Sequence, residues 1–370
     1  IAIPIHLGTL IPIVGEILKR NPIETLADGD IFIMNDPYLG GTHLPDIALV
    51  VPIFADGRAL GLSAAMVHHQ DVGGMTPGSV PTNATEIFQE GIRIPPLKLA
   101  SAGRFDENLR EILRLNVRLP EEFMGDINSQ IAACNVGRRR LQELCANYGH
   151  EFLLTVFDAL LDRSEIMTRA ALSRIPSGEY RYTDYLDNDG INIDQRIQIS
   201  VTAIIDGGEI TFDLDQSSEQ VDGPFNCVPS GSLSAACFAV RVLTGSDIPT
   251  NGGCFRPIHL KLPEGSIVNP TEPAPVNART STIKRIAGCM VSAFREVLPE
   301  KVTADSASEM LILQFGGQHA NAAIDIADRA DHRTGRTCAG GGQVVDGEGL
   351  VARSHTQCDA CRGVSTKVDP

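Results

Sequence analysis

Three histidines and two aspartates stand close together near the beginning of the chain, among glycines and prolines. They are His43, Asp46, His68, His69 and Asp71. Imidazole nitrogens and carboxylate oxygens are the usual ligands of Zn²⁺, Mn²⁺ and Fe²⁺ at open, reactive sites. Glycine and proline allow irregular backbone, so such side chains can converge where a single helix or strand could not unite them. The pattern predicts a catalytic site for a divalent metal.

The predicted metal ligands are His43, Asp46 and His68. His43 and Asp46 are three positions apart, and His68 ends a short apolar run. Successive residues of a strand face opposite sides, so His68 and His69 should not both reach one ion unless the strand has ended. We therefore expect His69 and Asp71 to be catalytic groups that orient the site or transfer protons.

Other interpretations of these residues remain open. The histidines can be ordinary loop residues, and Asp46 can cap a turn after Pro45. A non-haem iron oxygenase uses the same ligand types. A His-x-Asp pair on a strand would place both ligands on one face, whereas here the spacing is His-x-x-Asp across a proline. The oxygenase is therefore the weaker alternative. A second candidate metal site, a zinc half-site, lies in the tail at His355, Cys358 and Cys361, with Cys338 as a fourth ligand.

The elements that must position the first site are expected to be strands of a buried sheet. Apolar runs at residues 30–34, 47–54 and 60–68 are each bounded by Gly, Pro or Asp, which is typical of strands. The predicted ligands fall between the first two runs and at the end of the third. Such strand-end loops commonly carry functional groups on a packed scaffold.

The rest of the chain divides near residue 176. Helices are predicted at residues 10–18, around 109–113, from an Asp126 cap to Tyr148, and at 151–175, 232–243 and 283–298; strands are predicted at 180–185, 197–205, 209–214 and 257–262. We predict a mixed α/β and α+β fold, with mixed sheets and flanking helices. Residues 1–175 would form an α/β region with the metal site and a helical stretch, and residues 176–370 an α+β region.

Composition excludes several function classes. A net charge of −15 without a basic stripe argues against a nucleic-acid partner. No run of eighteen apolar residues appears, which argues against a membrane span. Nine scattered cysteines favour reduced thiols and a cytoplasmic location. The sequence has neither a phosphate-binding P-loop nor a Gly-x-Ser-x-Gly nucleophile motif. Because it opens on Ile1 without Met, we expect a chain truncated at one or both ends.

The chain contains a series of Gly- and Pro-rich loop motifs: Ile3–Gly8, Asn35-Asp36-Pro37-Tyr38, Gly40–Asp46, His68–Gly74, Gln89-Glu90-Gly91 and Pro273-Ala274-Pro275-Val276. In order and spacing, these motifs resemble those of the hydantoinase B family. The resemblance covers about residues 1–310, and the tail from about Asp325 does not match it. His6, which lies in the first motif, is a lower-ranked site candidate.

The resemblance implies a hydantoinase B-like fold and an enzyme divided between two kinds of subunit. A hydantoinase A-like ATPase partner would use ATP and Mg²⁺ to phosphorylate a carbonyl oxygen of the substrate. The B-type chain would hold the metal and complete ring opening of hydantoin, N-methylhydantoin or 5-oxoproline. The ligand pattern of the related acetone carboxylases carries over by motif to His43, Asp46 and His68. The alternatives are the alpha subunit of an ATP-dependent acetone or acetophenone carboxylase, which acts on a ketone, and a non-catalytic scaffold subunit.

Overall fold

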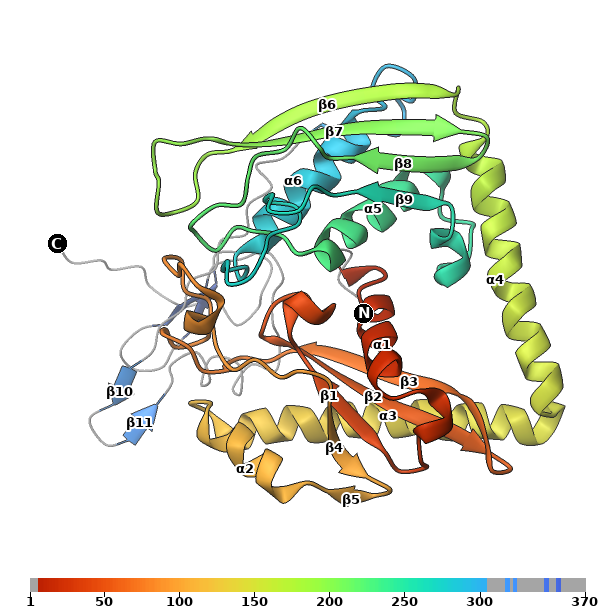
Figure 1. Cartoon of the computed structure of the whole chain (residues 1–370), viewed down its shortest axis with the longest axis vertical. Helices are drawn as coiled ribbons and strands as arrows, with labels where there is room; N and C mark the ends of the chain where they lie inside the picture. The colour runs from red at the N-terminus through yellow and green to blue at the C-terminus, as the bar shows by residue number, and fades with distance from the viewer. Residues whose placement is uncertain (1–5, 305–316, 320–321, 325–342, 346–350, 354–370) are drawn as a thin grey trace.

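The computed structural model describes residues 6–304 and four short strands in the tail. These strands are β10 (Gly317–His319), β11 (Ala322–Ile324), β12 (Gln343–Val345) and β13 (Val351–Arg353), which pair as β10 with β11 and β12 with β13. The predicted zinc half-site at Cys338, His355, Cys358 and Cys361 lies outside the described residues. Two larger sheets form the body of the molecule, and each is covered by helices (Figure 1).

The first sheet has five antiparallel strands in the order β3-β2-β1-β4-β5. Their bounds are Ile31–Met34 for β1, Asp46–Ala55 for β2, Arg58–His68 for β3, Leu97–Ser101 for β4 and Arg104–Phe105 for β5. The three predicted strands are therefore confirmed, whereas β4 and β5 were not predicted. Their short sequences have little alternation, and β4 joins the sheet by pairing with β1 across the intervening loops.

Helices cover both faces of this sheet, which explains why its central strands are apolar at nearly every position. Phe32 and Val50 pack with Ile13 of helix α1 (Leu10–Arg20). Ile33 and Leu49, on the opposite face, pack with residues of helix α3 (Pro120–Tyr148). Alternate strand residues point to opposite faces, so a strand covered on both sides needs apolar residues throughout.

The helical stretch differs from prediction at one end. Helix α2 (Glu107–Leu115) begins after Asp106, whose side chain accepts a hydrogen bond from the Leu109 amide. The prediction that Asp126 caps the next helix is wrong, because α3 already begins at Pro120 and Asp126 lies inside it. Proline is favoured at the first helical position, where its missing N–H is not needed.

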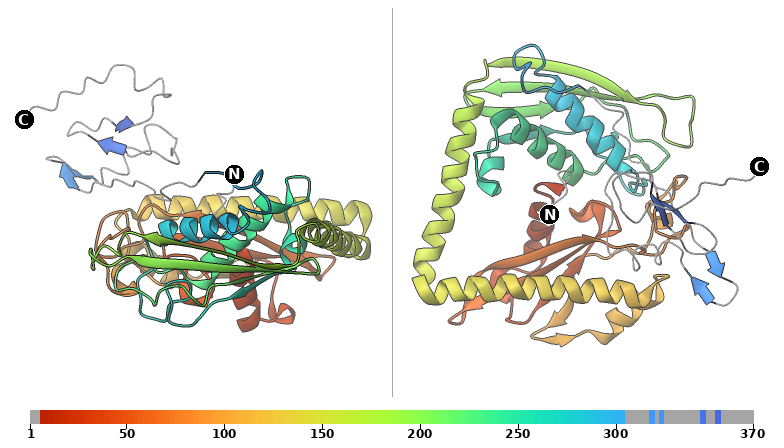
Figure 2. Two further views of the ribbon diagram at one scale, coloured as in Figure 1. Left: turned by 90° about the horizontal axis from the view of Figure 1, so that it is seen from above. Right: turned by 180° about the vertical axis from the view of Figure 1, so that it is seen from behind.

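Helix α3 ends at Tyr148, and after Gly149 helix α4 (His150–Leu172) leaves at a steep angle (Figure 1). Gly149 has a φ of 86°, a conformation that favours glycine at the end of a helix. The view from behind shows α3 running along the first sheet and α4 rising from its end towards the second sheet (Figure 2). Helices α3 and α4 therefore connect the first sheet to the second.

The second sheet has four strands in the order β6-β7-β8-β9. They are Gly178–Leu186, Ile197–Asp206, Glu209–Asp213 and Ile258–Lys261, and only the β8–β9 pair is parallel. Helices α5 (Pro229–Thr244) and α6 (Arg279–Ser292) pack against one face of the sheet. Short 3₁₀ helices complete the described elements: η2 (Ile23–Thr25), η3 (Pro37–Leu39), η4 (Ile87–Gln89) and η5 (Gly252–Phe255). The mixed fold with two sheets and flanking helices is confirmed.

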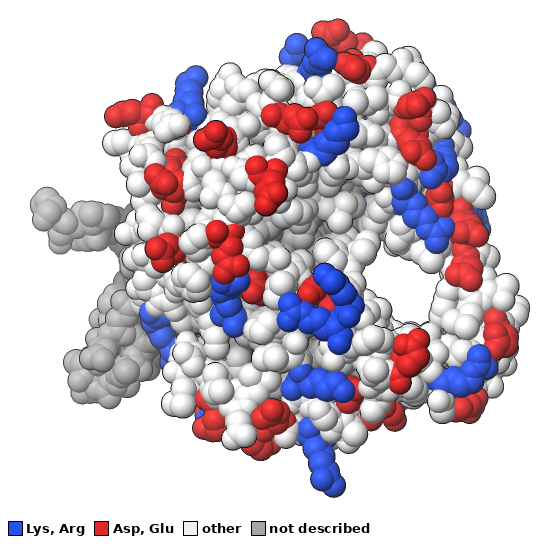
Figure 3. Space-filling view, viewed as in Figure 1, with Lys and Arg blue, Asp and Glu red and all other residues white. Residues whose placement is uncertain are grey.

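Acidic and basic side chains are interspersed on the face of the molecule shown in Figure 3, and they form no continuous basic stripe there. Within the described residues, no helix is long and apolar enough to cross a membrane. Six cysteines in this part of the chain are buried free thiols. The change from helix α4 to strand β6 falls at residues 172–178, beside the predicted division at residue 176.

Candidate metal centre

Strand pairing brings the predicted metal ligands together. Asp46 is the first residue of β2 and lies directly opposite His68, the last residue of β3. Directly opposed residues of antiparallel strands have neighbouring side chains. His43 stands on the loop that leads into β2, three residues before Asp46. Strands β2 and β3 form a hairpin, and its open end, away from the turn, therefore brings all three side chains together.

The loop before β2 is held in place by the buried side chain of Asn35. Its amide donates hydrogen bonds to the carbonyl oxygens of Leu44, at 2.7 Å, and Ile92, at 3.0 Å. Gly41 lies against the same turn, where an added Cβ would come within 2.5 Å of the Asn35 carbonyl oxygen. Only glycine permits this close approach. The loop thus has one defined path, and it places His43 next to the strand end.

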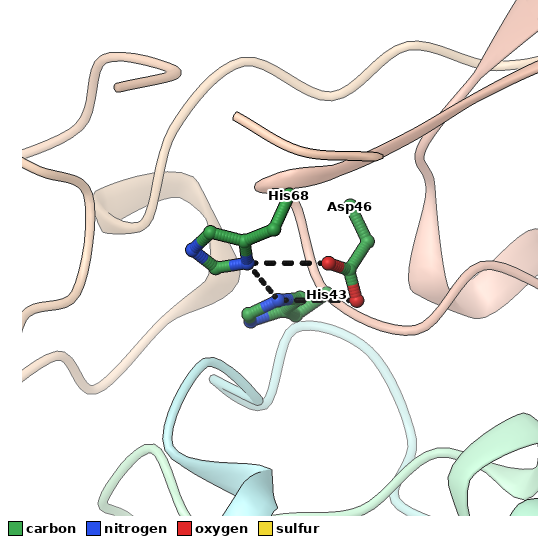
Figure 4. Close-up of side chains that lie close together, drawn as sticks. All are labelled: His43, Asp46 and His68. Atoms are coloured by element: carbon green, nitrogen blue, oxygen red, sulfur yellow. Dashed lines mark hydrogen bonds and ion pairs between the residues drawn. The ribbon is translucent and has the colours of Figure 1, made fainter. Parts of the chain in front are cut away.

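The three candidate ligand atoms form a compact group (Figure 4). His43 Nε2 lies 3.2 Å from Asp46 Oδ2, His68 Nδ1 lies 3.2 Å from Asp46 Oδ1, and the two imidazole nitrogens are 3.1 Å apart. All three ligand atoms lie within 4.8 Å of one another. His43 and Asp46 are buried, whereas the His68 side chain is 48% exposed. The group is closed on the protein side and open towards solvent beside His68.

Three further groups converge on the Asp46 carboxylate. The Thr42 hydroxyl donates to Oδ2 at 2.6 Å, and the buried Arg279 guanidinium donates to the same oxygen at 2.7 Å. His6 Nε2 lies 3.2 Å from Oδ2. The lower-ranked candidate His6 is therefore brought to the ligand group. Oδ1, in contrast, faces His68.

The environment favours the charge states that metal ligands require. Burial lowers the pKa of His43 to about 4, and the nearby Arg279 charge acts in the same direction. Burial alone would raise the pKa of Asp46, but the neighbouring side chains of His43, His6 and His68 hold it well below its usual range. Around neutral pH His43 is neutral and Asp46 is ionised, which is the ligand form of each side chain.

Sequence reasoning missed two residues of the site, Asn277 and Arg279. His43 Nδ1 lies 2.8 Å from Asn277 Oδ1, and Arg279 pairs with Asp46. Arg279 is the first residue of helix α6 and Asn277 lies two residues before it, more than 230 positions from the hairpin in sequence. The only available signal was their place directly after the recognised motif at Pro273–Val276.

The other two predicted site residues do not join the ligand group. His69 points the other way, where its Nε2 donates to Gln130 Oε1 at 3.0 Å and its ring packs on Phe123. Burial lowers the pKa of His69 to about 4, so its ring is neutral. Asp71 accepts hydrogen bonds from the amides of Gly73 and Gly78 and pairs with Arg118 at 3.0 Å. These contacts anchor a loop, and proton transfer by either residue stays a prediction.

Asp36, which the motif also contains, forms a turn. Its side chain accepts a hydrogen bond from the Tyr38 amide at 3.0 Å and pairs with Arg93 at 2.9 Å. It therefore caps the 3₁₀ helix η3 and ties this loop to the segment that precedes β4.

The protein therefore combines two helix-covered sheets with a His/Asp/His group at the end of a strand, which is a candidate metal centre. Comparison with known families identifies the class: the chain belongs to the hydantoinase B/oxoprolinase family, whose model matches residues 1–364. The family match therefore extends past residue 310, where the recognisable motifs stop, and includes most of the tail from Asp325.

Named relatives share most of this chain. It is 32% identical to the B-type subunit of a putative D-/L-hydantoinase from a Pseudomonas species, over 80% of this chain and 52% of that protein. The crystal structure of the ATP-dependent caprolactamase from Pseudomonas jessenii superposes with a TM-score of 0.77 at 33% identity, covering 81% of this chain and 52% of that one. A nucleotide-free acetone carboxylase has the same fold, with a TM-score of 0.71 at 22% identity over 81% of this chain and 42% of that one. The match covers about half the length of the hydantoinase and caprolactamase subunits and about a quarter of the related 5-oxoprolinases.

Proposed function

We propose that this chain is the metal-binding, B-type subunit of an ATP-dependent hydrolase that opens cyclic amides. The observation that carries the proposal is the His43, Asp46 and His68 group at the end of the β2–β3 hairpin. Family membership supports it, because relatives of this chain are named as a hydantoinase subunit, a caprolactamase subunit and 5-oxoprolinases. Hydantoins, N-methylhydantoins, 5-oxoproline and related lactams are the proposed substrate class.

The donor set fits a divalent cation such as Zn²⁺, Mn²⁺ or Fe²⁺. Two imidazole nitrogens and a carboxylate oxygen point at one another, and the buried carboxylate is ionised. A bound cation would supply Lewis acidity towards an amide oxygen or a water molecule. His43 and Asp46 would hold it from the protein side, and His68 would complete the ligand set at the solvent edge.

The surrounding residues orient these ligands. Arg279 and Thr42 occupy Asp46 Oδ2, which favours ligation through the Oδ1 oxygen that faces His68. The position of His68 leaves the solvent side accessible to a small ring. His69 and Asp71 lie behind the hairpin, and we propose that they support it and transfer protons only through intervening groups.

ATP would be used on another chain. The sequence lacks a P-loop, and relatives are named as subunits, so we propose a hydantoinase A-like ATPase as partner. That partner would activate the amide carbonyl with ATP and Mg²⁺, and this chain would receive the activated ring at the metal centre.

Metal analysis of the complex tests the proposal. The chain is co-expressed with its A-type partner, and metal content is measured by mass spectrometry for wild type, His43→Ala and Asp46→Asn. His259→Ala is the matched control, because this exposed histidine pairs with Glu209 on the second sheet. We expect one equivalent of metal in wild type and the control and none in the other two. Lactam-dependent ATP hydrolysis should follow the same order.

Three results would contradict this assignment. A metal-free wild-type complex with full lactam turnover would exclude a catalytic metal. Normal turnover with a lower melting temperature after metal removal would instead indicate a scaffold subunit. ATP hydrolysis that responds to ketones and bicarbonate, but not to lactams, would indicate the carboxylase alternative.

A further inference from the structure

A buried glutamate, Glu90, contacts the chain segment next to the candidate metal centre but is not one of the proposed ligands. Glu90 is fully buried, and its Oε1 accepts hydrogen bonds from the backbone amides of Val276 and Asn277, both at 2.9 Å. Its Oε2 is buried without a hydrogen-bond partner among the described residues. Burial raises the pKa of Glu90 to about 8, so the side chain is a neutral acid at neutral pH. A neutral acid offers a carbonyl oxygen to the two amides, as an amide side chain would.

The Asn277 segment that Glu90 holds is also the partner of His43. Asn277 Oδ1 lies 2.8 Å and its backbone carbonyl oxygen 3.3 Å from His43 Nδ1. The Asn277 side-chain nitrogen donates to the carbonyl oxygen of Ser79, which fixes the orientation of the amide. Two acceptors therefore face Nδ1, and a hydrogen bond to either of them requires the proton on His43 Nδ1.

This contact decides between two tautomers of His43. Asp46 Oδ2 lies 3.2 Å from His43 Nε2 and, being a carboxylate, would favour a proton on Nε2. A proton there would block the lone pair that a metal needs. The shorter contact to Asn277 favours a proton on Nδ1 and leaves Nε2 free, which is how second partners commonly prepare histidine ligands.

We propose that Glu90 is a positioning residue that clamps the 276–277 backbone, so that Asn277 keeps His43 in its metal-binding tautomer. The inference rests on the proposed function for the metal itself, but the tautomer is a property of this chain alone. A segment of the second half of the chain thereby prepares a ligand of the first half. The clamp requires a neutral acceptor oxygen at position 90 and does not require an ionisable group.

Two substitutions separate this role from acid–base catalysis. Glu90→Gln keeps the acceptor oxygen and removes the acid, whereas Glu90→Met keeps most of the side-chain volume and removes the acceptor. Asn277→Leu removes the last contact to His43. Glu86→Met is the matched control, because Glu86 is an exposed glutamate at the start of η4, the 3₁₀ helix that ends next to Glu90.

The first readout is the ¹⁵N spectrum of histidine-labelled full chain without metal, which distinguishes a proton on Nδ1 from one on Nε2. We expect wild type, Glu90→Gln and Glu86→Met to hold His43 with its proton on Nδ1. Glu90→Met and Asn277→Leu should shift the population towards Nε2. A His43→Gln variant assigns the signal. A wild-type tautomer in Glu90→Met overturns the proposal, whether or not Asn277→Leu shifts it.

The second readout is the dissociation constant for Zn²⁺ and the absorption spectrum of the Co²⁺ form. Loss of such an outer contact weakens metal binding by about 10–100-fold. We expect that loss in Glu90→Met and Asn277→Leu, with Glu90→Gln within about threefold of wild type. Equal affinity in all variants overturns the positioning role, whereas a wild-type chain that binds no Zn²⁺ overturns the proposed function and leaves the tautomer result standing. If Glu90→Met does not fold, Glu90→Leu replaces it.

Discussion

Arg279 and Asp46 form a buried ion pair at the candidate centre, and replacing Arg279 by Met tests its contribution. The two side chains are 1% and 0% exposed, and the guanidinium nitrogen lies 2.7 Å from Oδ2. Methionine keeps much of the volume of the arginine stem and removes its charge. Asp46 would then be a buried carboxylate whose nearest remaining donor is the Thr42 hydroxyl.

The expected cost follows from the burial of both groups. Removing one partner of a buried ion pair costs about 3–5 kcal/mol, because the other charge stays buried without compensation. Thr42 and the neighbouring histidines still contact Asp46, so we expect the lower end, about 3 kcal/mol. The Asp46→Asn variant should also lose stability, because it leaves Arg279 buried without its counterion.

A double-mutant cycle separates the pair from other effects. Free energies of unfolding are measured for wild type, Arg279→Met, Asp46→Asn and the double variant by urea titration with a metal chelator present. Circular dichroism is the suitable signal, because the chain contains no tryptophan. The double variant should lose less than the sum of the single losses by about 2 kcal/mol. Additive losses within about 0.5 kcal/mol would refute a direct Arg279–Asp46 interaction.

Two further predictions concern the same region. The pKa of Glu90 rises from 4.5 to about 8 on folding, so wild type should lose stability relative to Glu90→Gln as pH rises from 4.5 to 8, by at most about 5 kcal/mol. Parallel pH dependences of the two unfolding free energies would contradict this. Gly73→Ala should destabilise the chain by at least about 2 kcal/mol, because φ is 85° and the new Cβ would lie 2.4 Å from the Asn116 carbonyl oxygen. Gly57→Ala, with a φ of 74° but no atom within 4 Å, is its control for backbone strain alone, and an equal loss in both would exclude the clash.

Local patterns in the sequence predicted much of the fold and the ligand group. Apolar runs bounded by Gly, Pro and Asp identified β1, β2 and β3, since a strand covered on both faces is apolar throughout. Alternation along a strand separated His68 from His69, and the structure places them on opposite sides of the hairpin end. The His-x-x-Asp spacing and the later histidine indicated the group that the structure brings together.

Only the tertiary structure revealed what surrounds that group. Asn277 and Arg279 reach the hairpin from the second half of the chain, and no periodicity of 2 or 3.6 residues reports a contact across more than 230 positions. The position of Asp71 after the two histidines predicted a catalytic group. Its contacts with the Gly73 amide and with Arg118 are visible only in the folded structure. Residue type and spacing determined which atoms can bind a metal. The packing of the two halves decided the charge states of His43 and Asp46, because burial and the nearby Arg279 lower the pKa of His43, and the surrounding histidines lower that of Asp46.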